Sequence, residues 1–276
     1  MKGVMLTLAA MTAGICVADI SSSNVVGYQN RALNNGKKTY ICQTIKNMSD
    51  TIQNQKLGDW VPSPEFELDD DSIYFWDENG DIAGRYTYLR ASDRGTMGIP
   101  ADATVGWYTW EDVDDDWDFT NCQNDLPVPF GTMGLVLTSY GATMNFAGEV
   151  RNTETIIPLN NGKKTYIGNC TPVDMKLGQI KPTEEFELDD DSVYFWDENG
   201  DIEERYTYLH ASVRGTMGIP SDATVGWYTW SDVDDDWDFT DCQNNKKIVK
   251  AGDSFIVLTS YGASMKVPSP FEVGAE

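Results

Sequence analysis

The sequence predicts an all-β protein in which two tandem homologous modules, each sandwich- or barrel-like, follow a signal peptide. The first observation is an internal repeat, because residues 66–124 and 186–244 align without gaps and differ at only eight positions. The second is that β-branched and aromatic runs alternate with Gly, Pro and Asn, with no sustained helical period. Short strands separated by turn residues are typical of all-β sandwiches and barrels.

The repeat extends beyond this central block and divides the chain. The stretch LNNGKKTYI occurs at 33–41 and 159–167, and LTSYGA occurs at 137–142 and 258–263. The connecting spans differ in length and sequence, which indicates that they have specialised for different neighbours. We expect a signal peptide, a first module, a second module and a C-terminal tail, with the bounds 1–18, 19–147, 148–267 and 268–276.

The N-terminus has the pattern of a secretory signal peptide. Lys2 precedes an apolar run from Val4 to Ala18, which is too short to span a bilayer comfortably, and we expect cleavage after Ala18. No later segment approaches the length of a transmembrane helix. The sequence therefore predicts an extracellular or cell-surface protein without a membrane span.

The charge balance excludes one class of partner. The chain has 44 acidic and 20 basic residues, which gives a net charge of -24. Such a surface cannot neutralise phosphates and is repelled by an anionic membrane, so we expect no nucleic-acid partner. Its field attracts cations instead.

The stretch SIYFWDENGDIAGRYTYL predicts a β-hairpin. Asn79-Gly80 lies between two runs of β-branched and aromatic residues, which is a strong signal for a two-residue type I′ turn. This turn pairs Trp76 with Ala83. Because side chains alternate between faces, we expect Ile73 and Phe75 to face the core.

Cysteine usage agrees with export. Four cysteines remain after the signal peptide, and an even number in an exported protein favours disulfides. Of the three possible pairings, the repeat favours one bridge in each module, Cys42–Cys122 and Cys170–Cys242. The alternative is that all four are free thiols.

An acidic tract in each module makes calcium the candidate cofactor. Alternate carboxylates of one turn can converge on a hard cation, whereas the alternative is a solvated acidic turn. The DENGD stretch is a poorer candidate, because Ile82 and Tyr88 stand where an EF-hand loop needs Gly and Glu. The predicted ligands are Asp112, Asp114, Asp116 and Asp118, with Asp232, Asp234, Asp236 and Asp238 in the second module.

Aromatic side chains on the second face of the hairpin are candidate glycan-binding residues. Exposed Trp and Tyr rings can stack on sugars, and the alternative is that these rings fill small cores. The four candidates are Tyr74, Trp76, Tyr194 and Trp196.

No catalytic motif is shared by the two modules. The only histidine, His210, aligns with Arg90, and we expect it at the surface. The sequence has no GxSxG, HExxH or phosphate-binding loop. We therefore expect a protein that is not an enzyme.

Several stretches resemble a family of exported bacterial proteins. The start SSSNVVGYQN, the strand VYFWD and the closing stretch DSFIVLTSYGASMKV are similar to those of tandem β-module proteins with an N-V-V-G-Y-like mature N-terminus. That family is largely uncharacterised. The resemblance implies export and a non-catalytic β architecture.

These observations predict a structural or cell-surface protein, such as a filament, surface-layer or adhesion subunit. The C-terminal PFEVGAE is similar to the linker between the modules, with no module after it. We expect Phe271, Glu272 and Val273 to pair with an exposed edge of another copy, so that the partners are further copies or other surface proteins. The alternative is a pair of carbohydrate-binding modules with glycans as partners.

Overall fold

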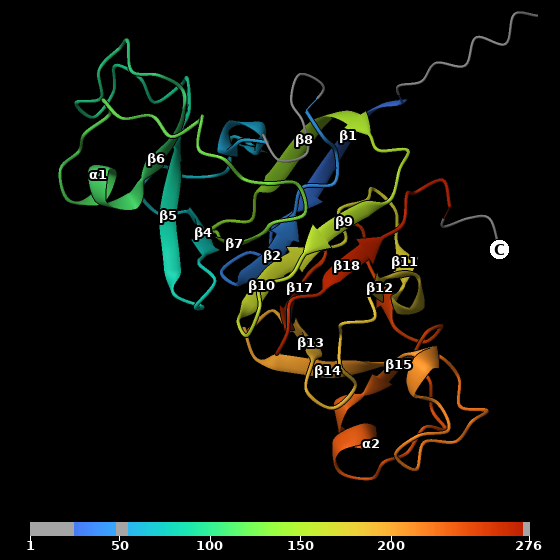
Figure 1. Ribbon diagram of the computed structural model, residues 1–276. Coiled ribbons are helices and arrows are strands. Elements are labelled where there is room, and N and C mark those ends of the chain that lie inside the picture. Colours follow the sequence, from blue (N-terminus) through green and yellow to red (C-terminus); the bar gives the residue numbers. More distant parts are fainter. Residues whose placement is uncertain (1–24, 48–54, 273–276) are drawn as a thin grey trace, which may run out of the picture.

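The structure is a computed structural model that describes residues 25–47 and 55–272. It consists of small antiparallel sheets in a propeller-like arrangement (Figure 1), so the all-β prediction is confirmed, although the sheets do not form the expected sandwich or barrel. The predicted signal peptide and Val273 lie outside the described residues. Within those residues, no helix has the length and apolar character needed to cross a membrane.

The N-terminal half of the chain contains two sheets. One has three strands in the order β1-β8-β3, and the other has five in the order β2-β7-β4-β5-β6. The elements are β1 Val25–Ala32, β2 Lys38–Cys42, the 3-10 turn Leu57–Asp59, β3 Val61–Pro62, β4 Ser72–Trp76, β5 Ile82–Leu89, β6 Gly106–Thr109, α1 Trp110–Asp114, β7 Met133–Leu137 and β8 Thr143–Val150.

The C-terminal half has the corresponding two orders, β9-β18-β12 and β10-β17-β13-β14-β15, with an additional pair β11-β16. The elements are β9 Thr155–Pro158, β10 Lys164–Gly168, β11 Met175–Lys176, the 3-10 turn Leu177–Gln179, β12 Lys181–Pro182, β13 Ser192–Trp196, β14 Ile202–Leu209, the 3-10 turn Ala211–Val213, β15 Gly226–Thr229, α2 Trp230–Asp234, β16 Ile248–Val249, β17 Ser254–Leu258 and β18 Ser264–Val267.

The central hairpin has the predicted strands with a shifted register near its tip. Ile73 pairs with Tyr86, as the sequence predicts. A bulge next to Trp76 then shifts the register, so that Trp76 pairs with Ile82 and not with Ala83. The extra residue of a bulge bends the strand and re-aims the side chain beside it.

The hairpin turn spans five residues, Asp77–Asp81, so the predicted two-residue turn is wrong. A type I′ turn needs positive φ at both central residues, but only Gly80 has it, at +93°. The Asp77 carboxylate accepts hydrogen bonds from the backbone N–H groups of Asn79 and Gly80, at 2.9 and 3.0 Å. The Asp81 N–H also donates to this carboxylate, at 3.0 Å. These hydrogen bonds, and the one from Asp81 most strongly, hold the pKa of Asp77 below its usual range. The side chain of Asp77 therefore fixes this loop.

The cores of the two halves fill the same space with different residues. In the N-terminal half, a Cβ on Gly134 would lie 2.9 Å from Ile73 and 3.2 Å from the ring of Trp60. The aligned residues in the C-terminal half are Phe255, Val193 and Ile180, and all three are buried. The gain of a phenyl ring at the glycine position is thus matched by smaller side chains at the other two positions, an exchange that conserves packed volume.

The two halves meet at the centre of the molecule, where β2, β7, β10 and β17 come together (Figure 1). Among the backbone hydrogen bonds that cross this junction, two are related by the repeat. The Cys42 N–H donates to Gly252 O at 3.0 Å, and the Gly168 N–H donates to Gly131 O at 3.2 Å. Cys42 aligns with Gly168 and Gly252 aligns with Gly131, so the two bonds are equivalent.

Candidate functional site

The hairpin turn of each half contacts the GKKTY turn of the other half. Trp76 stacks on Tyr166, with 5.0 Å between ring centroids and 8° between ring planes. The aligned pair, Trp196 and Tyr40, is 4.9 Å apart but edge to face, at 79°. Each half thus uses the same two turns to hold the other, as in an interface with two-fold symmetry.

Ion pairs repeat this reciprocity at the rim of the junction. Lys163 of the C-terminal half pairs with Glu78, and the aligned Lys37 of the N-terminal half pairs with Glu198. The four side chains are roughly half-exposed, so these pairs orient the turns more than they stabilise the junction.

Two buried cysteines lie in the apolar centre of the junction. A Cβ on Gly168 would lie 2.8 Å from Cys42 Sγ, so the two aligned positions cannot both carry a side chain. Cys42 and Cys170 belong to one buried cluster together with Ile157. Burial, followed by the nearby Cys170 thiol, raises the pKa of Cys42. Both thiols therefore behave as small apolar side chains here.

The predicted bridges Cys42–Cys122 and Cys170–Cys242 are wrong, because all four cysteines are free in the structure. Cys42 and Cys170 belong to the main core of the C-terminal half, which Cys42 enters from the other half, whereas Cys122 and Cys242 pack against two other clusters, one in each half. The two cysteines of one half thus belong to different cores, which the spacing in the sequence does not reveal.

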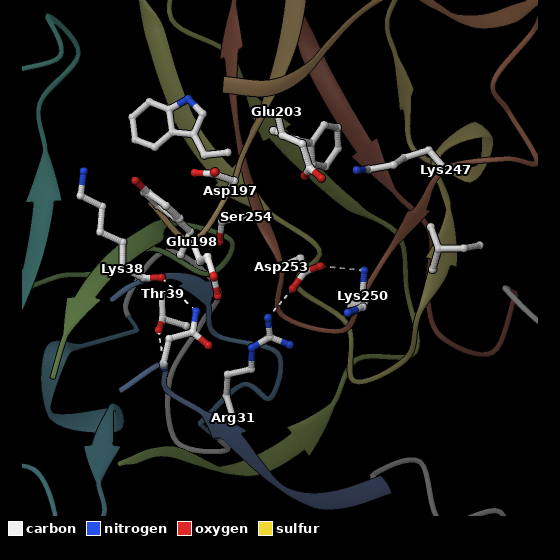
Figure 2. A pocket seen from close by; sticks show the side chains of 15 residues that line it. Arg31, Lys38, Thr39, Asp197, Glu198, Glu203, Lys247, Lys250, Asp253 and Ser254 are labelled. Carbon is white, nitrogen blue, oxygen red and sulfur yellow. Dashed lines mark hydrogen bonds and ion pairs between the residues drawn. The ribbon is translucent and has the colours of Figure 1, made fainter. Parts of the chain in front are cut away.

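A cavity of about 320 Å³ lies on one side of the junction, with walls from both halves of the chain. Figure 2 shows Arg31 and Asp253 reaching toward each other across it, with Lys247 approaching from the opposite wall. The lining residues are Arg31, Asn34, Lys38, Thr39 and Tyr40 from the N-terminal half, and Phe195, Trp196, Asp197, Glu198, Glu203, Lys247, Ile248, Lys250, Asp253 and Ser254 from the C-terminal half. We call this the polar cavity.

Acidic and basic side chains balance in the polar cavity, with four of each among its lining residues. Arg31 pairs with Asp253 and also donates from Nη1 to Ala251 O at 3.1 Å. Lys38 and Lys250 have no ion pair within the described part of the chain. In a protein with a net charge of -24, this cavity is a locally neutral site.

Four buried polar atoms around the polar cavity have no hydrogen-bond partner among the described residues. They are Arg31 Nε, Tyr40 Oη, Trp196 Nε1 and Ser254 Oγ. Ser254 is only 8% exposed, and its hydroxyl lies beside the Cys42 thiol but outside hydrogen-bond geometry. Buried polar atoms are rarely left unpaired, so each of these marks a position for a ligand or water.

The hydroxyl of Tyr40 stays protonated at any ordinary pH. Burial, followed by the charges of Asp197 and Asp201, raises the pKa of Tyr40 to about 12. The hydroxyl can therefore both donate and accept a hydrogen bond at the cavity wall.

The opposite side of the junction has the aligned cavity, of about 250 Å³, and it is apolar. Ile157 stands at the position of Arg31, Pro129 at that of Lys250, and Thr132 at that of Asp253. The lining residues are Pro129, Phe130, Thr132, Thr155, Ile156, Ile157, Pro158, Thr165, Tyr166 and Ile167. We call this the apolar cavity.

The acidic tracts predicted to bind calcium form a single helical turn and the loop that follows. Thr109 caps α1 by accepting a hydrogen bond from the Asp112 N–H at 3.3 Å, and Trp117 has φ +52° in the loop. Within residues 25–47 and 55–272, no three acidic, His or Cys side chains are placed to hold a metal ion. Calcium binding by Asp112, Asp114, Asp116 and Asp118, or by Asp232, Asp234, Asp236 and Asp238, stays a prediction.

The aromatic residues predicted to bind glycans do not form an open platform. Trp76 and Trp196 are half-buried in the junction. Tyr74 and Tyr194 lie under arginine side chains, with ring centroids 5.2 and 5.0 Å from the guanidinium carbons. Of these four aromatics, Trp196 alone lines the polar cavity.

The predicted assembly tail begins in a turn. Phe271 is 55% exposed, and the Glu272 N–H donates to Ser269 O at 3.0 Å, so these residues do not form a strand within the chain. Val273 lies outside the described residues.

His210 is 7% exposed, so the expected surface position is wrong. Its ring lies 4.7 Å from that of Tyr208, and Nδ1 is 3.6 Å from a carboxylate oxygen of Glu184. Burial lowers the pKa of His210, and Glu184 partly opposes this shift. The aligned Arg90 pairs with Asp93 at 2.8 Å, and the C-terminal half has Val213 at the position of Asp93.

Sequence reasoning missed the charged residues of the polar cavity, Arg31, Lys250 and Asp253. The signal lay in the repeat, because each has an uncharged partner at the aligned position. These three positions lie outside the nearly identical blocks, in segments that diverged between the copies. An analysis based on the conserved block therefore does not include them.

The fold and this site define an all-β chain whose two halves share a strand order and meet around one polar and one apolar cavity. Comparison of the chain with protein-family models, curated proteins and solved structures gives no match. Function is therefore inferred from the geometry.

Proposed function

We propose that the protein is an exported, non-enzymatic structural protein of the cell surface, built from two tandem homologous β modules. The observation that carries this proposal is the reciprocal junction, because the contact stretches DENG and GKKTY are identical in both halves. A surface that holds a copy of itself is self-complementary, as in a two-fold dimer. Such a module is a natural unit of assembly.

The remaining parts of the proposal come from the sequence. Export rests on the predicted signal peptide and on the resemblance to exported tandem β-module proteins. The non-enzymatic role is supported by the position of His210, which is buried against Tyr208 and does not line the polar cavity.

Strand β1 offers an edge for association with a second copy. It pairs with β8, and in the part of the chain that the structure describes no strand pairs with its other edge. Val26 and Tyr28 on this strand are each 66% exposed. A long edge with exposed apolar side chains templates pairing with another chain, for which the predicted partner is the tail around Phe271.

The aligned edge strand β9 provides the matched comparison. It has four residues where β1 has eight, and it ends at Pro158, which cannot donate to a ladder. Ile156 on β9 is exposed to a similar degree, 59%. We therefore expect assembly through β1 and not through β9.

Assembly of the secreted protein tests this proposal, with light scattering and electron microscopy as the measurements. We expect the intact chain to assemble, the double variant Val26→Lys/Tyr28→Lys to stay monomeric, and the control Ile156→Lys to assemble normally. Deletion of residues 268–276 should also leave a folded monomer. An intact chain that stays monomeric at high concentration, or a β1 variant that still assembles, contradicts the proposal.

A pair of carbohydrate-binding modules is the second candidate function, and the polar cavity is the observation that favours it. Trp196 lines this cavity with an unpaired indole N–H. Sugar binding without assembly would support this candidate over the structural role.

A further inference from the structure

We propose that the polar cavity binds one small, uncharged, polyhydroxylated molecule, with a single sugar ring as the expected chemical class. This inference does not depend on association through β1, and it narrows the carbohydrate-binding candidate to one site. The volume of about 320 Å³ lies at the lower end of the range for small-molecule pockets. A single ring fits this volume better than an extended chain.

The charges of the polar cavity favour an uncharged ligand. A carboxylate or phosphate would meet the four acidic side chains, and a metal ion would meet the four basic ones. Moving a charge into a site without net compensation is costly. A molecule with hydroxyl groups avoids this cost, because each hydroxyl can donate to an acid and accept from a base.

The unpaired atoms supply the hydrogen bonds that such a molecule needs. Trp196 Nε1 and Arg31 Nε are donors, while Tyr40 Oη and Ser254 Oγ can donate or accept. Two of these four atoms can only donate a hydrogen bond, and none can only accept one. The hydroxyl oxygens of a sugar are suitable acceptors for these donors. A ligand that satisfies these atoms removes the cost of leaving them unpaired.

The aromatic pairs differ between the two sides of the junction. Trp76 and Tyr166 are stacked, with 8° between their planes. Tyr40 meets Trp196 edge to face, at 79°, and Trp196 also meets Trp76 edge to face, with 6.4 Å between ring centroids. Tyr40 and Trp196 line the polar cavity, so this aromatic cluster offers apolar surface on which the C–H groups of a sugar ring can pack.

Divergence of the two copies points in the same direction. At the position of Arg31 the other copy has Ile157, and at the position of Ser254 it has Met133. These replacements remove both a charge and an unpaired hydroxyl, and they leave the aligned aromatic pair in place. The apolar cavity therefore serves as an internal control.

Binding of glucose, galactose, mannose and N-acetylglucosamine to the full chain, measured by calorimetry with glucuronate as the charged comparison, tests the proposal. We expect saturable binding of at least one neutral sugar, with one site for each chain and weaker binding of glucuronate. Trp196→Phe keeps an aromatic ring but removes the unpaired N–H, and it should weaken binding about tenfold. The control Trp76→Phe keeps a ring beside Trp196, whose centroid lies 6.4 Å from that of Trp76, and it should leave binding within about twofold because Trp76 does not line the polar cavity.

The double variant Arg31→Ile/Asp253→Thr carries the residues of the apolar side and should abolish binding while the protein stays folded. If the double variant does not fold, the proposal is tested by comparing the sugar affinities of Trp196→Phe and Trp76→Phe. Absence of binding by every neutral sugar, equal loss in both tryptophan variants, or tighter binding of glucuronate would overturn the proposal.

Discussion

The two cavities beside the junction are built from the same repeat, yet one is lined by charges and the other by apolar side chains. Arg31 faces Asp253 on the polar side, whereas Ile157 and Thr132 occupy these positions on the apolar side. The turns that hold the halves together are identical in both copies. The comparison teaches that the shared residues maintain the junction, while the residues that diverged give its two sides different properties.

The largest effect is expected when the apolar cavity receives the charge of the polar one. Ile157→Arg should lower the free energy of unfolding by about 4 kcal/mol, because Thr132 offers no carboxylate and the guanidinium stays unpaired. Adding Thr132→Asp should recover part of the loss. Denaturant unfolding measures both variants, and a loss below about 1 kcal/mol for the single variant would mean that the two sides tolerate charge equally.

The exchange of core residues between the halves is expected to give the next largest effect. Gly134→Phe should cost about 2–3 kcal/mol, because its new side chain overlaps Ile73 and Trp60. Adding Trp60→Ile and Ile73→Val in the same chain creates the combination found in the C-terminal half, Phe255 with Ile180 and Val193, and should restore most of the stability. A triple variant no more stable than Gly134→Phe alone would show that the two cores are not interchangeable.

The pH dependence of stability should differ between the halves through His210. Burial lowers the pKa of His210 below its unfolded value of about 6.5, so the folded state binds fewer protons. The neutral, buried imidazole therefore contributes its full stabilisation above about pH 6.5, and this stabilisation is lost as the pH falls through the folded pKa. His210→Gln should make the free energy of unfolding depend less on pH below about 6.5, whereas Arg90→Gln should leave that dependence unchanged. An unchanged pH profile in His210→Gln contradicts the burial of a neutral imidazole.

The rim ion pairs are expected to have the smallest effect and to be equal on the two sides. Glu78→Gln and Glu198→Gln should each cost less than about 1 kcal/mol, with the cost falling as salt is added, because these pairs are solvent-exposed. Thermal unfolding at low and high salt measures both. A large or unequal cost would show that the rim and not the apolar centre holds the halves.

The local structure was predictable where it depends on neighbours in the sequence. The pairing of Ile73 with Tyr86 follows from alternation and an Asn-Gly turn signal. The bulge beside Trp76 did not follow, because that ring is placed by Tyr166 of the other half. The orientation of the Trp76 side chain depends on contacts with the other half, and these contacts cannot be read from the sequence of one hairpin.

The polar cavity was not predictable, because its residues are brought together by the meeting of the two halves. Arg31 and Asp253 are 222 positions apart and lie in segments that diverged between the copies. The position of Cys42 has the same cause, since it packs into a cluster that otherwise consists mostly of residues of the C-terminal half. A search for aligned positions with opposite character would have found Arg31 without a structure.

The indole N–H signals in a proton–nitrogen NMR spectrum test the difference between the two cavities most directly. Trp196 lines the polar cavity, whereas the aligned Trp76 does not and contacts Trp196 only through its ring, with 6.4 Å between centroids. We predict that the Trp196 indole signal shifts with saturation, and that the Trp76 signal shifts much less. Equal shifts of the two signals, or no shift of the Trp196 signal with any neutral sugar tested, would contradict the assignment of the polar cavity as the ligand site.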